Sequence, residues 1–351
     1  FAPPAIIMNV TLKDLARSCG VSVGTVSRAL NGKNEVSQRT AQRIRQQALE
    51  MGYIPNLAGQ ALSAQKNISF IGVLLPSINN PFFDDIKRGL EAAARETRDL
   101  GLDIVLEEAE GWDPGVHLEA LERLKERNCR AFALCTLDDP RIRTQIDEFA
   151  ARGLPVLLIN NDIAASQRLC YVGPDYYKSG QIAAAMLDKC LPGRQLRILA
   201  VVGDRYHQGH RSRLEGFQDE LKERHCVYEL TEVVEGHDRD IDTQQAAMDA
   251  FTKHPEINCV YMATGSGVSG LGAAIIADRA HHRFVLACDE IYTTRELVKN
   301  DIVDFVICQD PVAQGYQAVR RLQEYLSRKQ GGSIDNYIVD NIIKLKNHFQ
   351  T

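Results

Sequence analysis

Hydroxyl groups and one cation are gathered between Ser22 and Arg28, within the stretch VSVGTVSRALNG at residues 21–32. Serine and threonine hydroxyls hydrogen-bond to phosphate oxygens, and the planar guanidinium of arginine can pair with a guanine edge through two hydrogen bonds. This is the chemistry of reading DNA. The stretch nevertheless opens on Val23 and Gly24. Gly24 can read no base and Val23 offers only an apolar contact, so base reading must come from later positions.

A second set of residues has the chemistry of a small-molecule site. Aromatic rings can cover the apolar face of a sugar, while amides, carboxylates and guanidinium groups pair with adjacent hydroxyls. Residues of both kinds gather near the ends of predicted strands: Asn80, Phe82, Phe83, Arg213 with its neighbour Arg211, Asp289 and Gln309. Each has an ordinary alternative, since phenylalanines fill cores and aspartates cap helices. Taken together at strand ends, they favour a ligand cleft.

Three short helices are predicted to position the first set. Thr11, three residues before Asp14, starts a helix that ends at Gly20, and Ser22 and Ser37 are the expected N-caps of the next two. Two short helices around a glycine turn, with a third covering their apolar faces, indicate a helix-turn-helix, whose second helix enters the major groove. The alternative is an unrelated three-helix bundle.

Charge is divided unevenly along the chain. Residues 8–66 hold eight cations and three anions, a net charge of +5, which leaves −10 for the rest of a chain whose total is −5. A basic amino-terminal module on an acidic body indicates that only the first part contacts a polyanion.

The segment from Thr11 to Lys66 resembles the headpiece and hinge of the LacI family of bacterial transcription regulators. The resemblance is carried by TLKDLARSCGVSVGTVSRALNG, by the VS at 36–37 and by GYIPN at 52–56. It implies phosphate contacts from Thr11, Ser22, Thr25, Asn31, Ser37 and Tyr53, with Ser27 and Arg28 near base edges and Arg28 on guanine. The implied DNA-binding set is completed by Leu12, Val23, Asn56, Gln60 and Leu62.

A short helix at 57–64 follows the break that Pro55 makes in the chain. By the same resemblance, this hinge helix folds on the operator, pairs with its partner across a dimer and inserts Leu62 into the minor groove. Gly59 and Gln60 stand where the family commonly carries alanine and often arginine. The glycine makes the hinge helix less favourable by about 1 kcal/mol, so operator binding depends more on docking of the body.

From Ile68 onward, apolar strand runs alternate with amphipathic helices, which predicts α/β structure with two doubly wound parallel sheets. The predicted first lobe covers about 68–169 and 302–328, and the second about 170–301 and 329–351. Ahead of this bilobed body we expect a headpiece at 8–54 and a hinge and linker at 55–67. Residues 1–7 are expected to be an appended remnant before a native start at Met8.

This body resembles the periplasmic sugar-binding proteins whose fold the same family uses for effectors. The resemblance adds Asn160, Asn161 and Ser266 to the cleft. Ribose-type binders have Asp-Arg in place of Asn160-Asn161 and Asn-Asp in place of Ser266-Gly267. Fewer charges then face the ligand, which favours a neutral sugar, sugar derivative or polyol; a purine-like or other metabolite, or no effector, are the alternatives. His207, His210 and His237 could reach the mouth of the cleft, but solvated loop positions are favoured for all three.

Several other classes are disfavoured. G-x-x-x-x-G-K-[ST] does not occur. GVSVG at 20–24 has the spacing G-x-S-x-G but falls between two predicted helices instead of after a strand, and the glycine-rich GSGVSG at 265–270 is a weak signal by itself, so neither an enzyme nor a cofactor is expected. No histidine spacing matches a metal site. Nine scattered cysteines suggest buried, reduced thiols, and no apolar run approaches the roughly 18 residues of a membrane span.

The resulting hypothesis is a homodimeric, cytoplasmic bacterial regulator that binds pseudo-palindromic operator DNA and a small effector, with repression as the expected action. Release from DNA and recruitment to it are both compatible with the sequence. No leucine heptads follow residue 340, so a dimer is expected. The competing class is an exported solute-binding protein, which would have no use for a basic headpiece.

Overall fold

The computed structural model describes residues 10–30, 36–51, 53, 68–203, 207–278, 281–328 and 332–350. The predicted hinge at 55–67 lies outside this range, and with it Asn56, Gln60 and Leu62. Asn31 and residues 1–7 also lie outside it. Within the described residues, no helix is long and apolar enough to cross a membrane.

The headpiece consists of α1 (Leu12–Cys19), α2 (Val23–Leu30) and α3 (Gln38–Glu50). Leu15, Val26 and Ile44, one from each helix, are fully buried against one another. Helices of 8 to 13 residues are marginal alone in water, so this shared core is what makes them stable.

Side chains cap each headpiece helix at its amino end. The Thr11 hydroxyl accepts from the Asp14 amide at 3.3 Å, and the Asp14 carboxylate accepts from the Thr11 amide at 3.0 Å, a reciprocal capping box. Ser22 and Ser37 accept from the amides three residues on, at 3.1 and 3.3 Å. At its other end, α1 terminates at Gly20 with a left-handed φ of 63°, a conformation that glycine adopts without strain. The three N-caps expected from the sequence are therefore confirmed.

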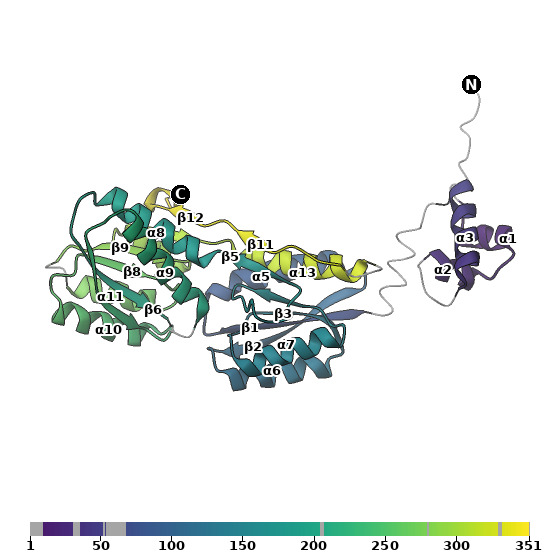
Figure 1. Ribbon diagram of the computed structural model, residues 1–351, viewed down its shortest axis with the longest axis horizontal. Helices are drawn as coiled ribbons and strands as arrows, with labels where there is room; N and C mark the ends of the chain where they lie inside the picture. Colours follow the sequence, from purple (N-terminus) through teal and green to yellow (C-terminus); the bar gives the residue numbers. More distant parts are fainter. Residues whose placement is uncertain are drawn as a thin grey trace, which may run out of the picture.

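The body has two lobes, each built on a six-stranded, mostly parallel sheet between helices (Figure 1). The first sheet has the order β11-β5-β4-β3-β1-β2. Its strands are β1 (Ser69–Ile78), β2 (Leu102–Glu110), β3 (Cys129–Leu134), β4 (Val156–Ile159), β5 (Cys170–Pro174) and β11 (Tyr337–Val339). One face is covered by α5 (Phe82–Arg98) and α13 (Pro311–Ser327), the other by α6 (Pro114–Glu126) and α7 (Pro140–Ala151).

The second lobe repeats this architecture, with the strand order β12-β10-β9-β8-β6-β7. Its strands are β6 (Leu196–Val202), β7 (Tyr228–Glu235), β8 (Cys259–Met262), β9 (Phe284–Cys288), β10 (Phe305–Cys308) and β12 (Ile342–Lys344), the last antiparallel to β10. Its helices are α8 (Tyr176–Cys190) and α9 (Gln208–Glu223) on one face, and α10 (Asp240–Lys253), α11 (Val268–Ala277) and α12 (Tyr292–Lys299) on the other, with a short 3-10 helix at Lys346–His348.

The chain crosses between the lobes three times, after β5, after β10 and between β11 and β12. The predicted lobe boundaries are wrong at three strands: β5 pairs with β4 and β11 with β5 in the first lobe, while β10 pairs with β9 in the second. Strands of a parallel sheet are apolar on both faces in either lobe, so their sequences do not reveal which sheet they join.

Candidate nucleic-acid interface and ligand cleft

The leading edge of α2 is exposed. Ser22, Val23, Gly24 and Arg28 all face solvent, with Val23 41% exposed. Among the other predicted contact residues, Thr11 and Ser37 are exposed, whereas Leu12, Thr25, Ser27 and Tyr53 are half-buried. Leu12 and Tyr53 pack against the headpiece core. An exposed apolar side chain such as that of Val23, on an otherwise polar edge, is suited to an apolar contact in a groove.

Gly24 leaves open space beside the Arg28 guanidinium. A Cβ atom placed on Gly24 would lie 3.6 Å from Arg28 Nη2 and 3.7 Å from Ser22 Oγ. The guanidinium therefore lies back along α2 over the glycine, one helical turn before its own Cα. A long side chain at position 24 would have to share this space with Arg28.

Two arginines of α3 have a structural role that the sequence did not reveal. Arg43 donates to the carbonyl of Cys19 at 3.0 Å, and Arg45 donates to the carbonyl of Ala29 at 3.3 Å. These carbonyls belong to the last turns of α1 and α2, where backbone acceptors lack helical partners. The basic excess of the headpiece thus includes cations that hold its helices together.

The cleft between the lobes brings together eight of the ten residues predicted for an effector: Asn80, Phe82, Phe83, Asn160, Arg213, Ser266, Asp289 and Gln309. It leaves out two. Asn161 is buried in the first lobe and donates to the carbonyl of Thr136 at 2.6 Å. Arg211 lines a separate hollow with Leu214 and Val233.

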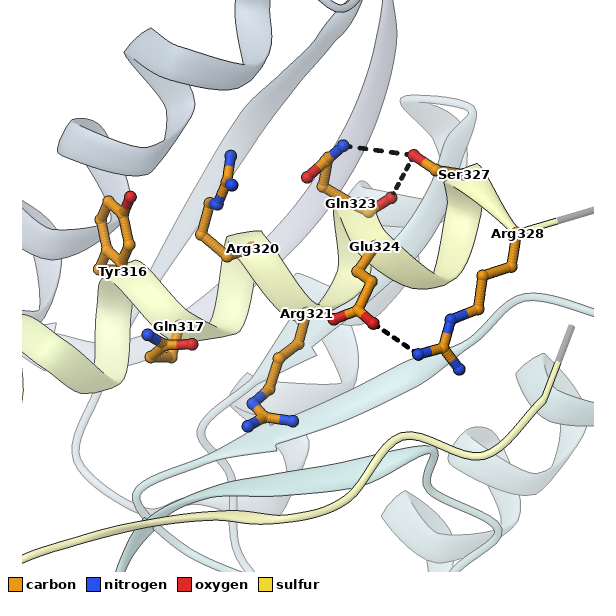
Figure 2. A pocket seen from close by; sticks show the side chains of 8 residues that line it. All are labelled: Tyr316, Gln317, Arg320, Arg321, Gln323, Glu324, Ser327 and Arg328. Carbon is orange, nitrogen blue, oxygen red and sulfur yellow. Dashed lines mark hydrogen bonds and ion pairs between the residues drawn. The ribbon is translucent and has the colours of Figure 1, made fainter.

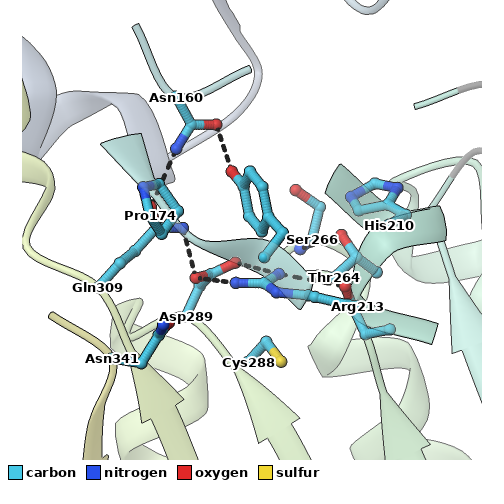
Figure 3. A network of polar contacts seen from close by, with 12 residues as sticks. Asn160, Pro174, His210, Arg213, Thr264, Ser266, Cys288, Asp289, Gln309 and Asn341 are labelled. Carbon is cyan, nitrogen blue, oxygen red and sulfur yellow. Dashed lines mark hydrogen bonds and ion pairs between the residues drawn. The ribbon is translucent and has the colours of Figure 1, made fainter. Parts of the chain in front are cut away.

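An ion pair lies at the centre of the cleft (Figure 3). Arg213 donates from Nη1 and Nη2 to the two oxygens of Asp289 at 3.0 and 2.9 Å, and from Nη1 to the carbonyl of Ala263 at 3.1 Å. The guanidinium also stacks on the Tyr176 ring, 4.8 Å from its centroid. Burial favours neutral Arg213, but the adjacent Asp289 carboxylate outweighs it and holds the pKa of Arg213 well above its usual value.

The position of Arg213 depends on close packing of α8 against α9. A Cβ on Gly180 would lie 1.9 Å from the backbone oxygen of Arg213, and one on Gly216 would lie 2.0 Å from the backbone oxygen of Tyr177. Only glycine permits this approach. The two glycines therefore set how far Arg213 reaches into the cleft.

A chain of amides joins the ion pair to the first lobe. Gln309 donates to Asp289 at 2.7 Å and accepts from Asn160 at 3.0 Å and from Gln314 of α13 at 2.7 Å. Tyr176, from the second lobe, donates to the Asn160 side chain at 2.9 Å. This buried network links the lobes beside the crossovers that follow β5 and β10.

Phe82 and Phe83 form the aromatic wall of the first lobe. Their rings meet edge to face with centroids 5.3 Å apart, and the side-chain oxygen Oδ1 of Asn80 accepts from the Phe82 amide at 3.2 Å. Both rings also belong to the core of that lobe, so they combine the two roles that the sequence left open.

Sequence reasoning missed further cleft residues: Trp112, Tyr176, Asp238 and Thr264. It was also wrong about two histidines, because His207 and His210 are buried cleft residues whose rings stack 4.2 Å apart. Burial is the main reason that the pKa of His207 lies well below its usual value, followed by the nearby His210 and arginines. His207 is therefore a neutral group. His237, by contrast, is exposed as expected.

Three polar cleft residues adopt left-handed backbone conformations. Asn160, Asp238 and Asp289 have φ values of 63°, 56° and 66°. Such conformations are costly for residues other than glycine and concentrate where side chains must be aimed at a ligand. The cleft is also tight, with a cavity of about 40 Å³ against the roughly 300–1,000 Å³ of typical ligand pockets. A ligand must therefore separate the lobes to enter.

A larger hollow of about 670 Å³ follows α13 on the outside of the first lobe (Figure 2). Its cations are engaged within the protein: Arg328 pairs with Glu324, Arg320 lies 3.8 Å from Glu96, and Arg321 donates to the carbonyl of Asp335. Polar groups from both lobes converge in the interlobe cleft instead.

Comparison with known proteins bears on both parts of the chain. Residues 71–330 match the family described as periplasmic binding protein domain, and residues 11–56 match bacterial regulatory proteins, lacI family. The body of the chain belongs to the periplasmic binding protein domain family, and its headpiece is a lacI-family domain. The predicted family and fold class are thereby confirmed.

Two curated relatives of this chain come from Bacillus subtilis strain 168. The HTH-type transcriptional regulator DegA is 27% identical over 217 residues, which are 62% of this chain and 62% of DegA. The ribose operon repressor is 26% identical over 245 residues, 70% of each chain. The alignment thus spans less than two thirds of DegA. A solved glucose-galactose binding protein, GanP from Geobacillus stearothermophilus, is 19% identical with a TM-score of 0.73, over 80% of this chain and 98% of GanP.

Proposed function

We propose that this lacI-family protein is a homodimeric transcription regulator, acting as a repressor in the bacterial cytoplasm. Its headpieces bind pseudo-palindromic operator DNA, and a small sugar-like or polyol effector in the interlobe cleft sets the affinity. The observation that carries this proposal is the combination of an exposed α2 edge with a cleft in which Arg213, Asp289 and Gln309 converge. No enzymatic step is needed for such a function.

The DNA-binding part rests on the headpiece. Its three helices are capped and share a core, so α2 is held rigidly with Ser22, Val23 and Arg28 outward. Two headpieces related by a dimer axis read half-sites about one helical turn apart, a geometry for which helix-turn-helix dimers are the general example. Binding-site selection from random duplex DNA, with Arg28→Ala compared against wild type, tests this part. If the selection enriches no palindromic sequence, the proposed binding of DNA by a dimer is contradicted.

The effector part rests on the chemistry of the cleft. Aromatic rings of Phe82 and Phe83 face a network of amide, carboxylate and guanidinium groups, which is the combination that binds sugar rings and hydroxyl pairs. The names of the ribose operon repressor and of the glucose-galactose binding protein support the same ligand class. Thermal shift of the full chain against sugars, polyols and nucleosides tests it. If only nucleosides raise the melting temperature, a nucleoside replaces the sugar as the proposed ligand. If no compound raises it, the proposal of an effector is contradicted.

Coupling between the two parts is proposed to run through the lobes. Because the cavity is small, a ligand must change lobe separation, and rotation of the first lobes across a dimer would move the two hinges apart or together. Coupling of this kind is typically about 1 to 3 kcal/mol. Leu62→Ala should weaken operator binding while leaving unfolding of the body unchanged. Unaltered operator affinity in that variant would argue against a hinge that inserts Leu62.

A further inference from the structure

Trp112 and Asp238 make a hydrogen bond between the lobes on the side of the cleft opposite the crossovers. Trp112 follows β2, the edge strand of the first sheet, and Asp238 follows β7, the edge strand of the second. The crossovers leave from β5, β10 and β11 toward the other edges of the two sheets. The indole Nε1 donates to Asp238 Oδ2 at 3.3 Å. Opening the lobes about the crossovers must therefore break this contact.

Asp238 is held in a specific position from within the second lobe. Its Oδ1 accepts from the Thr264 hydroxyl at 2.8 Å, and its backbone is left-handed. A Cβ on Gly203 would lie 2.0 Å from Oδ1, so a glycine is required to admit the carboxylate. The carboxylate is fixed before any ligand arrives, and its Oδ2 faces the first lobe.

Contacts within the first lobe fix the position of Trp112. His117 is fully buried, with one ring nitrogen 3.0 Å from the Gly111 carbonyl and the other 2.8 Å from the Thr136 hydroxyl. This holds the loop that carries Trp112. On the other side, the indole meets the His207 ring edge to face, with centroids 4.5 Å apart.

The charges that line the cleft leave no cation for an anionic ligand. Among the lining residues other than the histidines, the charged side chains are Arg213, Asp238 and Asp289, a net charge of −1, and burial lowers the pKa of His207 well below its usual value. Both terminal nitrogens of Arg213 are used by Asp289 and by the Ala263 carbonyl. Its Nε is buried without a partner and suits a neutral oxygen such as a hydroxyl.

We infer that Trp112 and Asp238 form a ligand-displaced contact across the mouth of the cleft: the Asp238 carboxylate exchanges the indole for hydroxyl groups of an uncharged polyhydroxy ligand and rejects anionic ligands. This rests on the proposed effector role of the cleft. Two hydroxyls on adjacent carbons supply the donors that a carboxylate accepts. A sugar acid or sugar phosphate would meet the same carboxylate with like charge and no free cation.

Trp112 is the sole tryptophan of the chain, so its emission reports this contact directly. In the ligand-free full-length protein, Asp238→Ala should shift the emission to the red, because the indole loses its partner and gains water. Asp249→Asn, which removes an exposed carboxylate on α10, is the matched control and should leave the emission unchanged. Identical emission in wild type and Asp238→Ala would overturn the contact.

Titration with matched probes tests the ligand class. The pairs are D-ribose with D-ribose 5-phosphate and D-galactose with D-galacturonate, together with myo-inositol. We expect a saturable emission change with at least one neutral probe and a weaker response to its anionic counterpart. Asp238→Asn should weaken binding of the neutral probe about tenfold, since a charged acceptor becomes a neutral one. An anionic probe that binds as tightly as its neutral counterpart, or an Asp238→Asn effect no larger than that of Asp249→Asn, would overturn the inference.

Three readouts separate this inference from the proposed function. A probe that raises the melting temperature without changing the Trp112 emission would overturn the inference but still support a ligand site in the cleft. A neutral probe that changes the emission but not operator affinity would support the inference and contradict effector control. Absence of any response, in emission or in melting temperature, would contradict both.

Discussion

Arg213 and Asp289 form a bidentate ion pair, and their side chains are only 2% and 8% exposed. Asp289→Ala would leave the guanidinium buried without its counter-charge, which typically costs about 3–5 kcal/mol. We expect urea unfolding of the body to show a loss of that size. Replacing both partners, as in Arg213→Met with Asp289→Leu, should lose much less stability while abolishing ligand-induced thermal shifts. A double variant as unstable as Asp289→Ala would contradict this reading.

Buried histidines should make the body sensitive to mild acid. Burial is the main cause that lowers the pKa of both His117 and His207. Below about pH 6.5, the unfolded chain binds protons that the folded chain does not, so stability falls as pH falls, by up to about 1.4 kcal/mol per unit and per group. The stability that these neutral histidines contribute is fully present above about pH 6.5.

Urea unfolding at pH 7.5 and pH 5.5 measures this dependence. His117→Gln should be less stable than wild type at pH 7.5, because the hydrogen bonds to Gly111 and Thr136 are disturbed. Its stability should nevertheless fall less between the two pH values, because one titrating group is gone. Parallel losses in the two proteins would show that His117 does not carry the effect.

The sequence predicts the headpiece and the body to different extents. Caps at Thr11, Ser22 and Ser37 follow from residues three apart, so the headpiece could be predicted accurately. Residues at strand ends, such as Asn160 and Asp289, could be predicted because parallel strands place their carboxyl ends at one edge.

Other features depend on contacts between distant segments. Trp112 and Asp238 are 126 residues apart and lie in loops after edge strands, where no local pattern marks them. His207 and His210 have the composition of a solvated loop, and only the closed cleft buries them. The assignment of β5 and β10 to their lobes likewise depends on where the chain crosses.

Comparison of Arg43 with Arg39, both on α3, should distinguish a cation that stabilises the headpiece from one that only contributes charge. Arg43→Ala removes a hydrogen bond to the Cys19 carbonyl and should destabilise the headpiece by about 1 kcal/mol, seen as faster amide hydrogen exchange in α1. Arg39→Ala is the matched control, since this exposed side chain lies on the same helix. Equal exchange rates in the two variants would show that the Arg43 contact does not stabilise α1.

Base preference should be uneven across each half-site. Val23 can touch only apolar groups and Gly24 none, while Arg28 lies beside the space that Gly24 leaves. Binding-site selection should return a loose consensus opposite Val23 and Gly24, and a tight one opposite Arg28 and at the centre. Arg28→Ala should cost about 1–3 kcal/mol and relax preference at one position. Tight preference opposite Val23 and Gly24 would overturn these assignments.

The most direct test of effector control is the operator affinity of the full-length protein, measured at fixed salt with and without a ligand that stabilises the body. We predict a change of at least about fivefold, equivalent to a coupling of about 1 kcal/mol. The change should disappear in Arg213→Met with Asp289→Leu while basal operator affinity remains. A ligand that occupies the cleft and leaves operator affinity unchanged would contradict a regulator controlled through its cleft.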